Sequence, residues 1–546
     1  MHSTITLRQE PRPERIDIGD GLVMRWSTPD DKDNLSDCFA DAFRWDTAGR
    51  HIPESGIPEK NEYIAAATSR LMSGKHVVQS QYDIALIEDA ARQSQGANPI
   101  VAAICMQQMA GYYGPIDITY GTLGAVGSLP EYRNRGLVRR LFLEMMHPVA
   151  EARGDLMTFI IGIPHFYRLF GYEYAVPHKF GRALKDLPSV YPALATPKGN
   201  ASGADVTPTE PFCLREATPS DIPYLIKMST PDRLHCNAQL GIYYGKDFWT
   251  YIVTQLRPEL IENHHDAHHH GGIIVDAKSG KNIGISLTSN LTGRWTWEVV
   301  SIDEDQSVTY RDVMPSILRQ LKSFDLPYYE CYNAKLNNNI LPNESELSKR
   351  ERGEFSPLEF KDIGINLTKH HPVTKLLDSQ GKLAPENPPF RLYTRIHSLP
   401  KWIRKIAPVL EERLRDSPLK GISARIQLDF YRKLEGMSGK GLEIVFRQGK
   451  FISAEDWAPK NPIQMHQESL KKKNKADTRS TCEEVEDTIL SGGFAPMTFT
   501  RLVTGTIDIS ELLLRDSENY VRDGETKLVL EVLFPKFDHF VDLFWW

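Results

Sequence analysis

Two arginines and a glycine, Arg133, Arg135 and Gly136, follow an apolar stretch directly and precede an amphipathic run. A glycine at the start of a helix lets backbone N–H groups converge on one point, and the helix dipole adds partial positive charge there. Such a corner binds a phosphate or a diphosphate well. The spacing Arg-x-x-Gly also occurs at plain basic helix caps, so the motif alone leaves both interpretations open.

The residues around this corner predict the elements that must position it. The stretch DITYGTLGAV, residues 117–126, reads as a strand, and LMTFIIGI, residues 156–163, reads as the next one. The short run HFYRLF, residues 165–170, predicts a helical piece that ends at Gly171. Between the strands, four-residue spacing of apolar side chains predicts one face of a helix: Leu137, Leu141, Met145 and Val149.

Composition limits the class of protein. A chain of 546 residues exceeds one hydrophobic core and predicts roughly three or four domains. A net charge of −6 and 41% hydrophobic residues indicate an ordinary globular protein, with neither nucleic acid nor a membrane as partner. The sequence shows no signal segment and no apolar run long enough to span a bilayer, so we predict a cytoplasmic protein. Six scattered cysteines without a C-x-x-C pair indicate neither a disulfide framework nor a zinc site.

Two stretches of the chain predict an internal duplication of one fold, and a chance similarity is the alternative. The stretch CLREATPSDIPYLIKMS, residues 213–229, follows the same strand, turn, Pro, Asp and helix order as VMRWSTPDDKDNLSDCF, residues 23–39. Proline, glycine and small polar residues indicate a linker between the two copies. We predict that the third domain begins with a helix. The predicted boundaries are 20–187 for the first domain, 188–211 for the linker, 212–390 for the second domain with an insertion near 337–390, and 391–546 for the third domain.

The order of strand, VGSLPEYRNRGLVRRLF at 126–142, strand, and FYRLFGYE at 166–173 resembles the acetyl-CoA-binding core of the GNAT acetyltransferases. The whole layout is similar to the enhanced intracellular survival (Eis) subfamily, which has an active GNAT domain, a degenerate second one and a sterol-carrier-like C-terminal domain. The resemblance therefore implies an α+β or α/β fold class: tandem GNAT folds, each a mixed central sheet flanked by helices, and then a sterol-carrier-like α+β domain. Val138 departs from the Gly or Ala that GNAT loops usually carry, although Eis proteins also have a branched residue there.

The resemblance implies acetyl-CoA as co-substrate and no metal. The loop would hold the diphosphate, and the end of the preceding strand would offer backbone groups to the pantetheine and the thioester oxygen. A buried strand end without a ligand is the alternative. The implied cofactor-binding residues are Val126, Gly127, Ser128, Arg133, Asn134, Arg135, Gly136, Leu137, Val138, Arg139, Gly162 and Ile163.

Two catalytic residues also follow from the resemblance. Tyr167 falls on the tyrosine that donates a proton to the departing CoA thiolate, and the alternative is a core tyrosine among neighbouring aromatic residues. The carboxylate of Trp546 would help remove the proton of the amine, and the alternative is an aromatic end that seals the third domain. Glu131 and Glu173 are further candidate bases by nearness in sequence, although Glu131 also suits a first helical turn.

The sequence thus predicts an acetyl-CoA-dependent N-acetyltransferase acting on a primary amine: a lysine, a polyamine or an amino-bearing small molecule. Two alternatives stay open: a carrier of lipid or another apolar ligand, and a noncatalytic acyl-CoA-binding protein. A homo-oligomer also stays open. His264 and His268 have the i, i+4 spacing of a metal site, but two glycines follow, so we predict a solvated loop instead.

Overall fold

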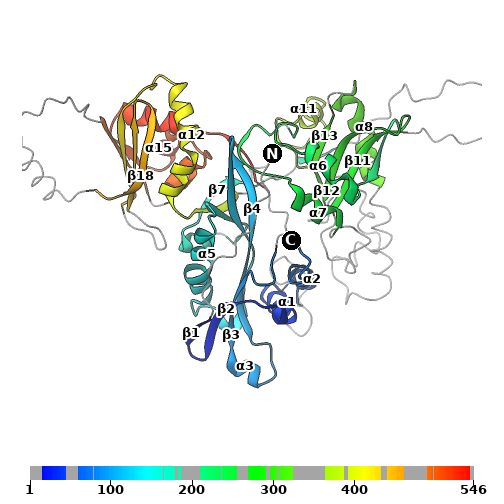
Figure 1. Cartoon of the computed structure of the whole chain (residues 1–546), viewed down its shortest axis with the longest axis horizontal. Coiled ribbons are helices and arrows are strands. Elements are labelled where there is room, and N and C mark those ends of the chain that lie inside the picture. Colours follow the sequence, from blue (N-terminus) through cyan, green and yellow to red (C-terminus); the bar gives the residue numbers. More distant parts are fainter. Residues whose placement is uncertain are drawn as a thin grey trace, which may run out of the picture.

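In the computed structural model, the described part of this chain forms three β-sheets, of ten, six and five strands. The first sheet forms the lower and central part of the molecule in Figure 1, and the second and third sheets lie on either side of its upper end. The structure describes residues 15–44, 60–77, 79–163, 165–178, 182–185, 210–234, 236–254, 269–289, 296–303, 307–323, 363–385, 391–431, 440–459, 488–495 and 497–541.

The first sheet contains strands from all three predicted domains. Its main path runs, in spatial order, through β1 (Arg15–Gly19), β2 (Leu22–Trp26), β3 (Ile84–Asp89), β4 (Ile100–Tyr113), β5 (Ile116–Ser128), β6 (Met157–Ile160), β15 (Arg391–Ile396) and β7 (Glu173–Pro177). Two further strands extend it: β10 (Ala238–Ile242) pairs with β4, and β21 (Asp538–Phe540) pairs with β10. Pairing along the main path is antiparallel except between β5 and β6, which run parallel. A parallel pair requires a crossover, and the helical run between these two strands supplies it.

That crossover is one continuous helical run over residues 137–152. It comprises α4 (Leu137–Arg140), the π-helical segment η4 (Leu141–Met146) and α5 (His147–Ala152). The predicted apolar face is confirmed, because all four of its members are buried. The α-helices α1 (Lys32–Ala42), α2 (Glu62–Leu71) and α3 (Ala90–Ser94) also belong to this part of the chain.

The second sheet is built mostly from the predicted second domain, 212–390, and one strand at residues 182–183 comes from the end of the predicted first domain. Its strand order is β8 (Arg182–Ala183), β14 (Gly364–Ile365), β13 (Thr296–Ile302), β12 (Asn282–Ser289), β11 (His269–Asp276) and β9 (Phe212–Glu216). The helices are α6 (Ile222–Met228), α7 (Lys246–Thr254), α8 (Tyr310–Ser323) and α11 (Pro372–Ser379). Of the histidine run, residues 269 and 270 lie in β11, while His264 and His268 lie outside the described residues.

The repeat has a physical counterpart in the two copies. Arg25 binds both carboxylate oxygens of Asp31, at 2.7 and 2.8 Å, and Arg215 binds both oxygens of Asp221, each at 2.8 Å. In both copies that aspartate also closes a capping box with a threonine three residues earlier. In each copy, the equivalent ion pair therefore holds the turn that leads from the strand into the first helix.

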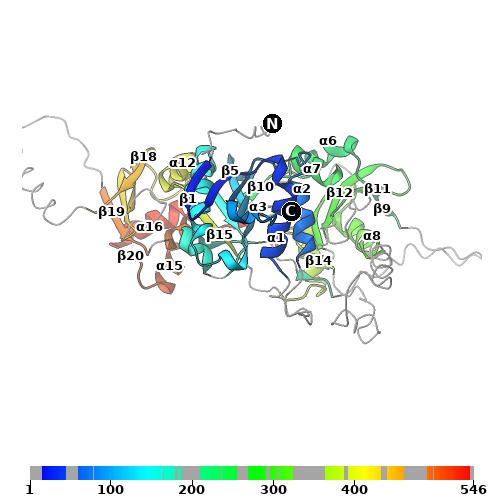
Figure 2. The same cartoon turned by 90° about the horizontal axis from the view of Figure 1, so that it is seen from below.

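The third sheet has the order β18 (Lys450–Trp457), β17 (Gly441–Arg447), β16 (Ala424–Asp429), β19 (Thr488–Gly493) and β20 (Tyr520–Val521). Alternate residues of β16 are buried, as expected when one face of a sheet packs on helices. The helices are α12 (Leu399–Arg415), α14 (Thr498–Val503), α15 (Ile509–Arg515) and α16 (Gly524–Leu533). Figure 2 shows this sheet and its helices together at one end of the molecule.

One local expectation is wrong. Residues 391–396, expected to begin a helix, form β15 in the first sheet, and the helix starts only at Leu399 after the N-cap Ser398. The aromatic and β-branched content of RLYTRI favours a strand once neighbouring strands are present.

The remaining architecture, mixed sheets flanked by helices, confirms the predicted fold class. The domain boundaries stay predictions. No helix of the described residues is long and apolar enough to cross a membrane.

Candidate active site

Strands β5 and β6 separate at the point where the sequence predicts the thioester. They pair from Tyr120 opposite Met157 to Leu123 opposite Ile160, and there β6 ends while β5 continues to Ser128. A register shift against β4 just beyond Leu123 marks a bulge. Val126, Gly127 and Ser128 therefore pair with β4, and no strand of the described residues pairs with them on the other side. Backbone groups on that edge are available to a ligand.

The end of α1 packs closely on the separated part of β5. A Cβ atom on Gly127 would lie 2.9 Å from the Cβ of Ala42, so only glycine permits this approach. Arg133 Nη2 donates a hydrogen bond of 3.3 Å to the carbonyl of the same Ala42. The end of α1, the end of β5 and the basic loop therefore meet at one corner.

The loop after β5 has the backbone that an anion cradle requires. Residues 133–136 are all exposed, and both Asn134 (φ 62°) and Gly136 (φ 75°) adopt left-handed conformations. Gly136 is the N-cap of α4, and no side chain of the described residues caps this turn. The first-turn N–H groups of the helix therefore lack a side-chain acceptor. An ideal Cβ on Gly136 would meet no atom within 4 Å, so the side of the loop on which this Cβ would lie is open.

The loop arginines are held near this opening. Arg135 lies over the ring of Tyr132, 5.2 Å from its centroid, and its Nη2 is 3.8 Å from Asp20 Oδ2. Leu137 is buried, and Val138 is partly buried against the hydrophobic core of this domain. The branched side chain at position 138 therefore packs inward. Uncapped amides, an open approach and basic side chains fit a diphosphate.

Tyr167 lies in the 3₁₀ helix η5 (Phe166–Phe170), directly against Gly162. A Cβ on Gly162 would lie 1.9 Å from Tyr167 Cε2, so the glycine makes room for the ring. The side chain is buried, which raises the pKa of the Tyr167 phenol and keeps it protonated at neutral pH. No described residue forms a hydrogen bond with its Oη. The ring thus packs as a core tyrosine does, while the hydroxyl stays available as a proton donor.

Two exposed isoleucines lie beside the separated strands, on the β6 side. Ile163 is 63% exposed and Ile161 is 47% exposed, although large aliphatic side chains are normally buried. Because β6 ends at Ile160, these two residues lie just past the strand, next to Gly162. Ile161 was not among the predicted site residues, and its exposure cannot be inferred from an apolar run.

The other predicted bases differ in their surroundings. Glu131 is exposed and pairs with Arg92 at 3.0 Å, as a helix-start carboxylate does. Glu173 is buried and pairs with Arg168 at 2.8 Å.

Trp546 lies outside the described residues. The last described residue, Val541, forms a parallel bridge with His178, directly after β7. Among the described residues no cluster of His, Cys, Asp or Glu could hold a metal ion.

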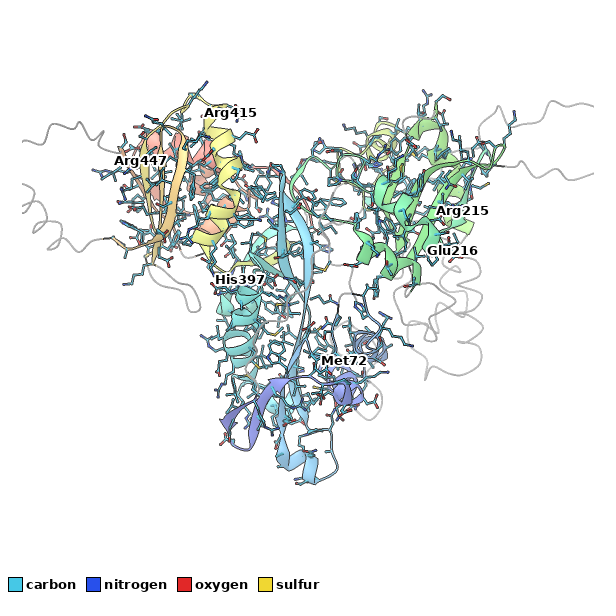
Figure 3. All side chains as sticks on the ribbon, viewed as in Figure 1. Met72, Arg215, Glu216, His397, Arg415 and Arg447 are labelled. Carbon is cyan, nitrogen blue, oxygen red and sulfur yellow. The ribbon has the colours of Figure 1, made fainter. Side chains whose placement is uncertain are left out.

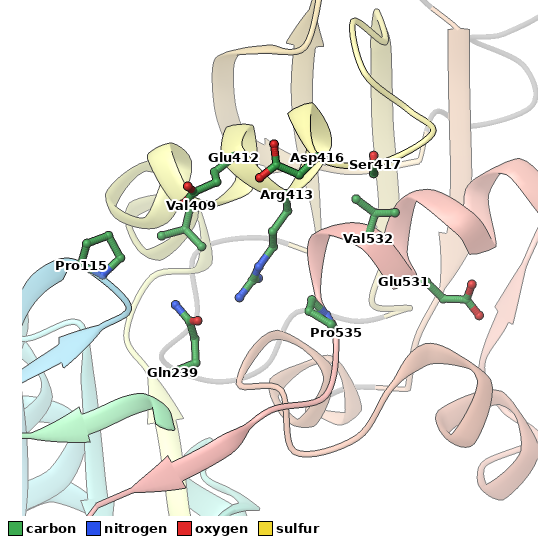
Figure 4. A pocket seen from close by; sticks show the side chains of 10 residues that line it. All are labelled: Pro115, Gln239, Val409, Glu412, Arg413, Asp416, Ser417, Glu531, Val532 and Pro535. Carbon is green, nitrogen blue, oxygen red and sulfur yellow. The ribbon is translucent and has the colours of Figure 1, made fainter. Parts of the chain in front are cut away.

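A separate pocket of about 500 Å³ lies between the first sheet and the helices α12 and α16 of the third region. Figure 4 shows Arg413 pointing into it from α12, opposite Gln239 and Pro535. Arg413 Nη1 donates to the carbonyl of Leu533 at 2.6 Å and to Tyr113 Oη at 3.2 Å. None of the predicted site residues lines this pocket. It lies between α12, α16 and the β4–β5 hairpin.

The comparisons with known proteins agree with this geometry. Residues 24–175 match the model of the acetyltransferase (GNAT) domain. These residues form a GNAT acetyltransferase domain, a class of domain that uses acetyl-CoA and acts on amines.

The whole chain shares its fold with solved structures. A probable N-acyltransferase from Enterococcus faecalis aligns with a TM-score of 0.54 at 13% identity, covering 96% of this chain and 99% of that one. A GCN5-related N-acetyltransferase from Kribbella flavida aligns with a TM-score of 0.51 at 12% identity, covering 96% and 98%. Eis1 from Mycobacterium abscessus aligns over 95% and 99%, but its TM-score of 0.47 at 10% identity is too low to support an inference. No curated protein sequence matches this chain significantly.

Proposed function

We propose that this protein transfers the acetyl group of acetyl-CoA to a primary amine, carried by a lysine, a polyamine or an amino-bearing small molecule. The main support for the proposal is that the unpaired end of β5 leads into the basic loop at residues 133–136. The strand loses its parallel partner after Leu123 and runs into an uncapped helix start at Gly136. A ligand with a diphosphate at one end and an extended amide-containing arm fits this combination.

In the proposed arrangement the loop binds the diphosphate and the β5 edge binds the pantetheine arm. The open backbone at Gly136 and the exposed loop support the first part, and the unpaired edge of β5 beside Ile161 and Ile163 supports the second. The proposed cofactor-binding residues are Val126, Gly127, Ser128, Arg133, Asn134, Arg135, Gly136, Leu137, Val138, Arg139, Gly162 and Ile163.

The proposed reaction uses few protein groups. The amine attacks the thioester carbon, a C–N bond forms, and the C–S bond breaks. The phenol of Tyr167 is protonated at neutral pH and donates this proton to the departing sulfur. A backbone N–H at the end of β5 stabilises the developing oxyanion, an effect worth several kcal/mol in general.

The carboxylate of Trp546 is the proposed acceptor of the amine proton. The bridge between Val541 and His178 supports this role, because it holds the chain beside β7 of the acetyltransferase domain. Five further residues could reach at most about 17 Å from that bridge.

Two further proposals concern the rest of the protein. A sterol-carrier-like fold for the third region is supported by its five-stranded sheet with helices packed on one face. A cytoplasmic location is supported by the composition of the chain.

The test measures release of free thiol from acetyl-CoA with a panel of amines, beside calorimetric binding of acetyl-CoA. We expect binding without any amine, and thiol release with at least one member of the panel. Tyr167→Phe should lower turnover at least ten-fold and leave the Kd for acetyl-CoA unchanged. Binding without thiol release from any amine would instead support a noncatalytic acyl-CoA-binding protein, and absence of binding would refute the cofactor site.

A further inference from the structure

Strand β15 lies between the two strands that flank Tyr167, although it comes from a segment more than 200 residues away in sequence. Tyr393 sits opposite Ile160 of β6 and opposite Tyr174 of β7. The helical turn that carries Tyr167 connects β6 to β7. The chain 157–177 therefore does not complete its own sheet, and β15 occupies the gap.

Alternate residues of β15 point toward the Tyr167 turn and the helix α5. Tyr393 belongs to the same hydrophobic core as Tyr167, and their ring centroids are 5.6 Å apart. Arg395 is buried and donates to the carbonyl of Phe170, and His397, just past the strand, accepts or donates a 2.7 Å hydrogen bond with Thr158. Figure 3 labels His397 at the upper end of α5.

Two hydrogen bonds from β15 hold both ends of the turn. The N–H of His165, the residue before η5, donates to Tyr393 Oη at 2.8 Å. The carbonyl of Phe170, the last residue of η5, accepts from Arg395 Nη1 at 3.0 Å. His165 has φ 66°, a conformation that residues other than glycine adopt only at a cost, and the bond to Tyr393 Oη helps to hold it.

We propose that Tyr393 and Arg395 are positioning residues for Tyr167. They fix the turn at its two ends, and the Tyr393 ring packs on the Tyr167 ring. The acyltransferase site is thus completed by the chain that leads into the third region. This inference rests on the proposed function, in which Tyr167 is the proton donor.

The structure offers a matched control for Tyr393→Phe. Tyr174 Oη accepts a hydrogen bond of 2.8 Å from the N–H of Arg391, at the other end of β15. Tyr393→Phe and Tyr174→Phe each remove one phenol acceptor from a backbone N–H in the same group of strands, and both keep the ring. Only the first bond holds the Tyr167 turn.

The experiment compares four proteins: Tyr393→Phe, Tyr174→Phe, Tyr167→Phe and the double variant Tyr167→Phe/Tyr393→Phe. We expect Tyr393→Phe to lower kcat about ten-fold without changing the Kd for acetyl-CoA, and Tyr174→Phe to change kcat less than two-fold. In the double variant, kcat should equal that of Tyr167→Phe, because Tyr393 acts through Tyr167. Hydrogen exchange should become faster across residues 161–170 in the two variants that carry Tyr393→Phe and in neither of the other two.

The outcomes separate the inference from the function beneath it. If Tyr167→Phe is impaired while Tyr393→Phe behaves as Tyr174→Phe does, the positioning role is wrong and the proton donor stands. Losses that multiply in the double variant would also overturn the positioning role. If Tyr167→Phe retains full kcat, the proton-donor assignment fails, and the positioning role fails with it.

Discussion

Replacing Gly136 by alanine tests the diphosphate cradle with a built-in control. Gly136 (φ 75°) begins the helical run 137–152, and Gly154 (φ 87°) follows its end. An ideal Cβ at either position meets no atom within 4 Å, so neither alanine clashes with the protein. The structural cost is the left-handed backbone alone, roughly 1–2 kcal/mol for an L-residue. Both variants should therefore lose the same modest amount of thermal stability.

Their effects on the cofactor should differ. At Gly136 the added methyl group and the strained backbone disturb the convergence of the first-turn N–H groups. A hydrogen bond to a charged group contributes about 1.5–3 kcal/mol, so losing one raises Kd roughly 10- to 150-fold. Isothermal titration calorimetry with CoA should show this loss for Gly136→Ala and a Kd within two-fold of wild type for Gly154→Ala. Equal Kd values for both variants would refute the cradle.

Two further predictions concern the tyrosine and the pH dependence of stability. Gly162→Ala would place its Cβ 1.9 Å from Tyr167 Cε2, so the ring must move. We therefore expect kcat to fall at least ten-fold, and an unchanged kcat would show that the ring position does not matter. His76, His147 and His397 are buried, and burial holds the pKa of His76 at about 3 and the pKa values of the other two well below 6.5. Below pH 6.5 the unfolded chain binds protons that the folded chain does not, so stability is retained above pH 6.5 and decreases as the pH falls. The loss is about 1.4 kcal/mol per histidine per pH unit, or roughly 4 kcal/mol for three at pH 5.5, and melting curves from pH 7.5 to 5.5 would contradict it if the midpoint stayed constant.

The local parts of the site could be predicted from the sequence. The Arg/Gly loop, the strand before it and the short turn with Tyr167 are contiguous motifs, and the structure has each of them where the residues indicated. The π-helical segment was not predicted. Apolar residues spaced by four drift about 40° per step on a 3.6-residue helix, so one wider turn keeps them on one face. The four-residue spacing of the apolar residues is therefore compatible with a π-helical segment. The same spacing is also easily taken for that of an ordinary α-helix.

The non-local parts could not be predicted. The strands β10, β15 and β21 come from distant segments of the chain and pair within the first sheet. Local sequence patterns do not predict which strands they pair with. RLYTRI was assigned to the amphipathic helix that follows it, because hydrophobic periodicity does not show where a short strand ends and a helix begins. The bond from His165 to Tyr393 spans 228 residues, so it is visible only in the folded chain.

The most direct test of the central claim is a crystal structure of this protein with CoA. We predict electron density for the diphosphate against the N–H groups that follow Gly136, for the pantetheine arm along β5 beyond Leu123, and for the sulfur within hydrogen-bonding distance of Tyr167 Oη. CoA bound elsewhere, for example in the pocket around Arg413 with the loop at Gly136 unoccupied, would contradict the account.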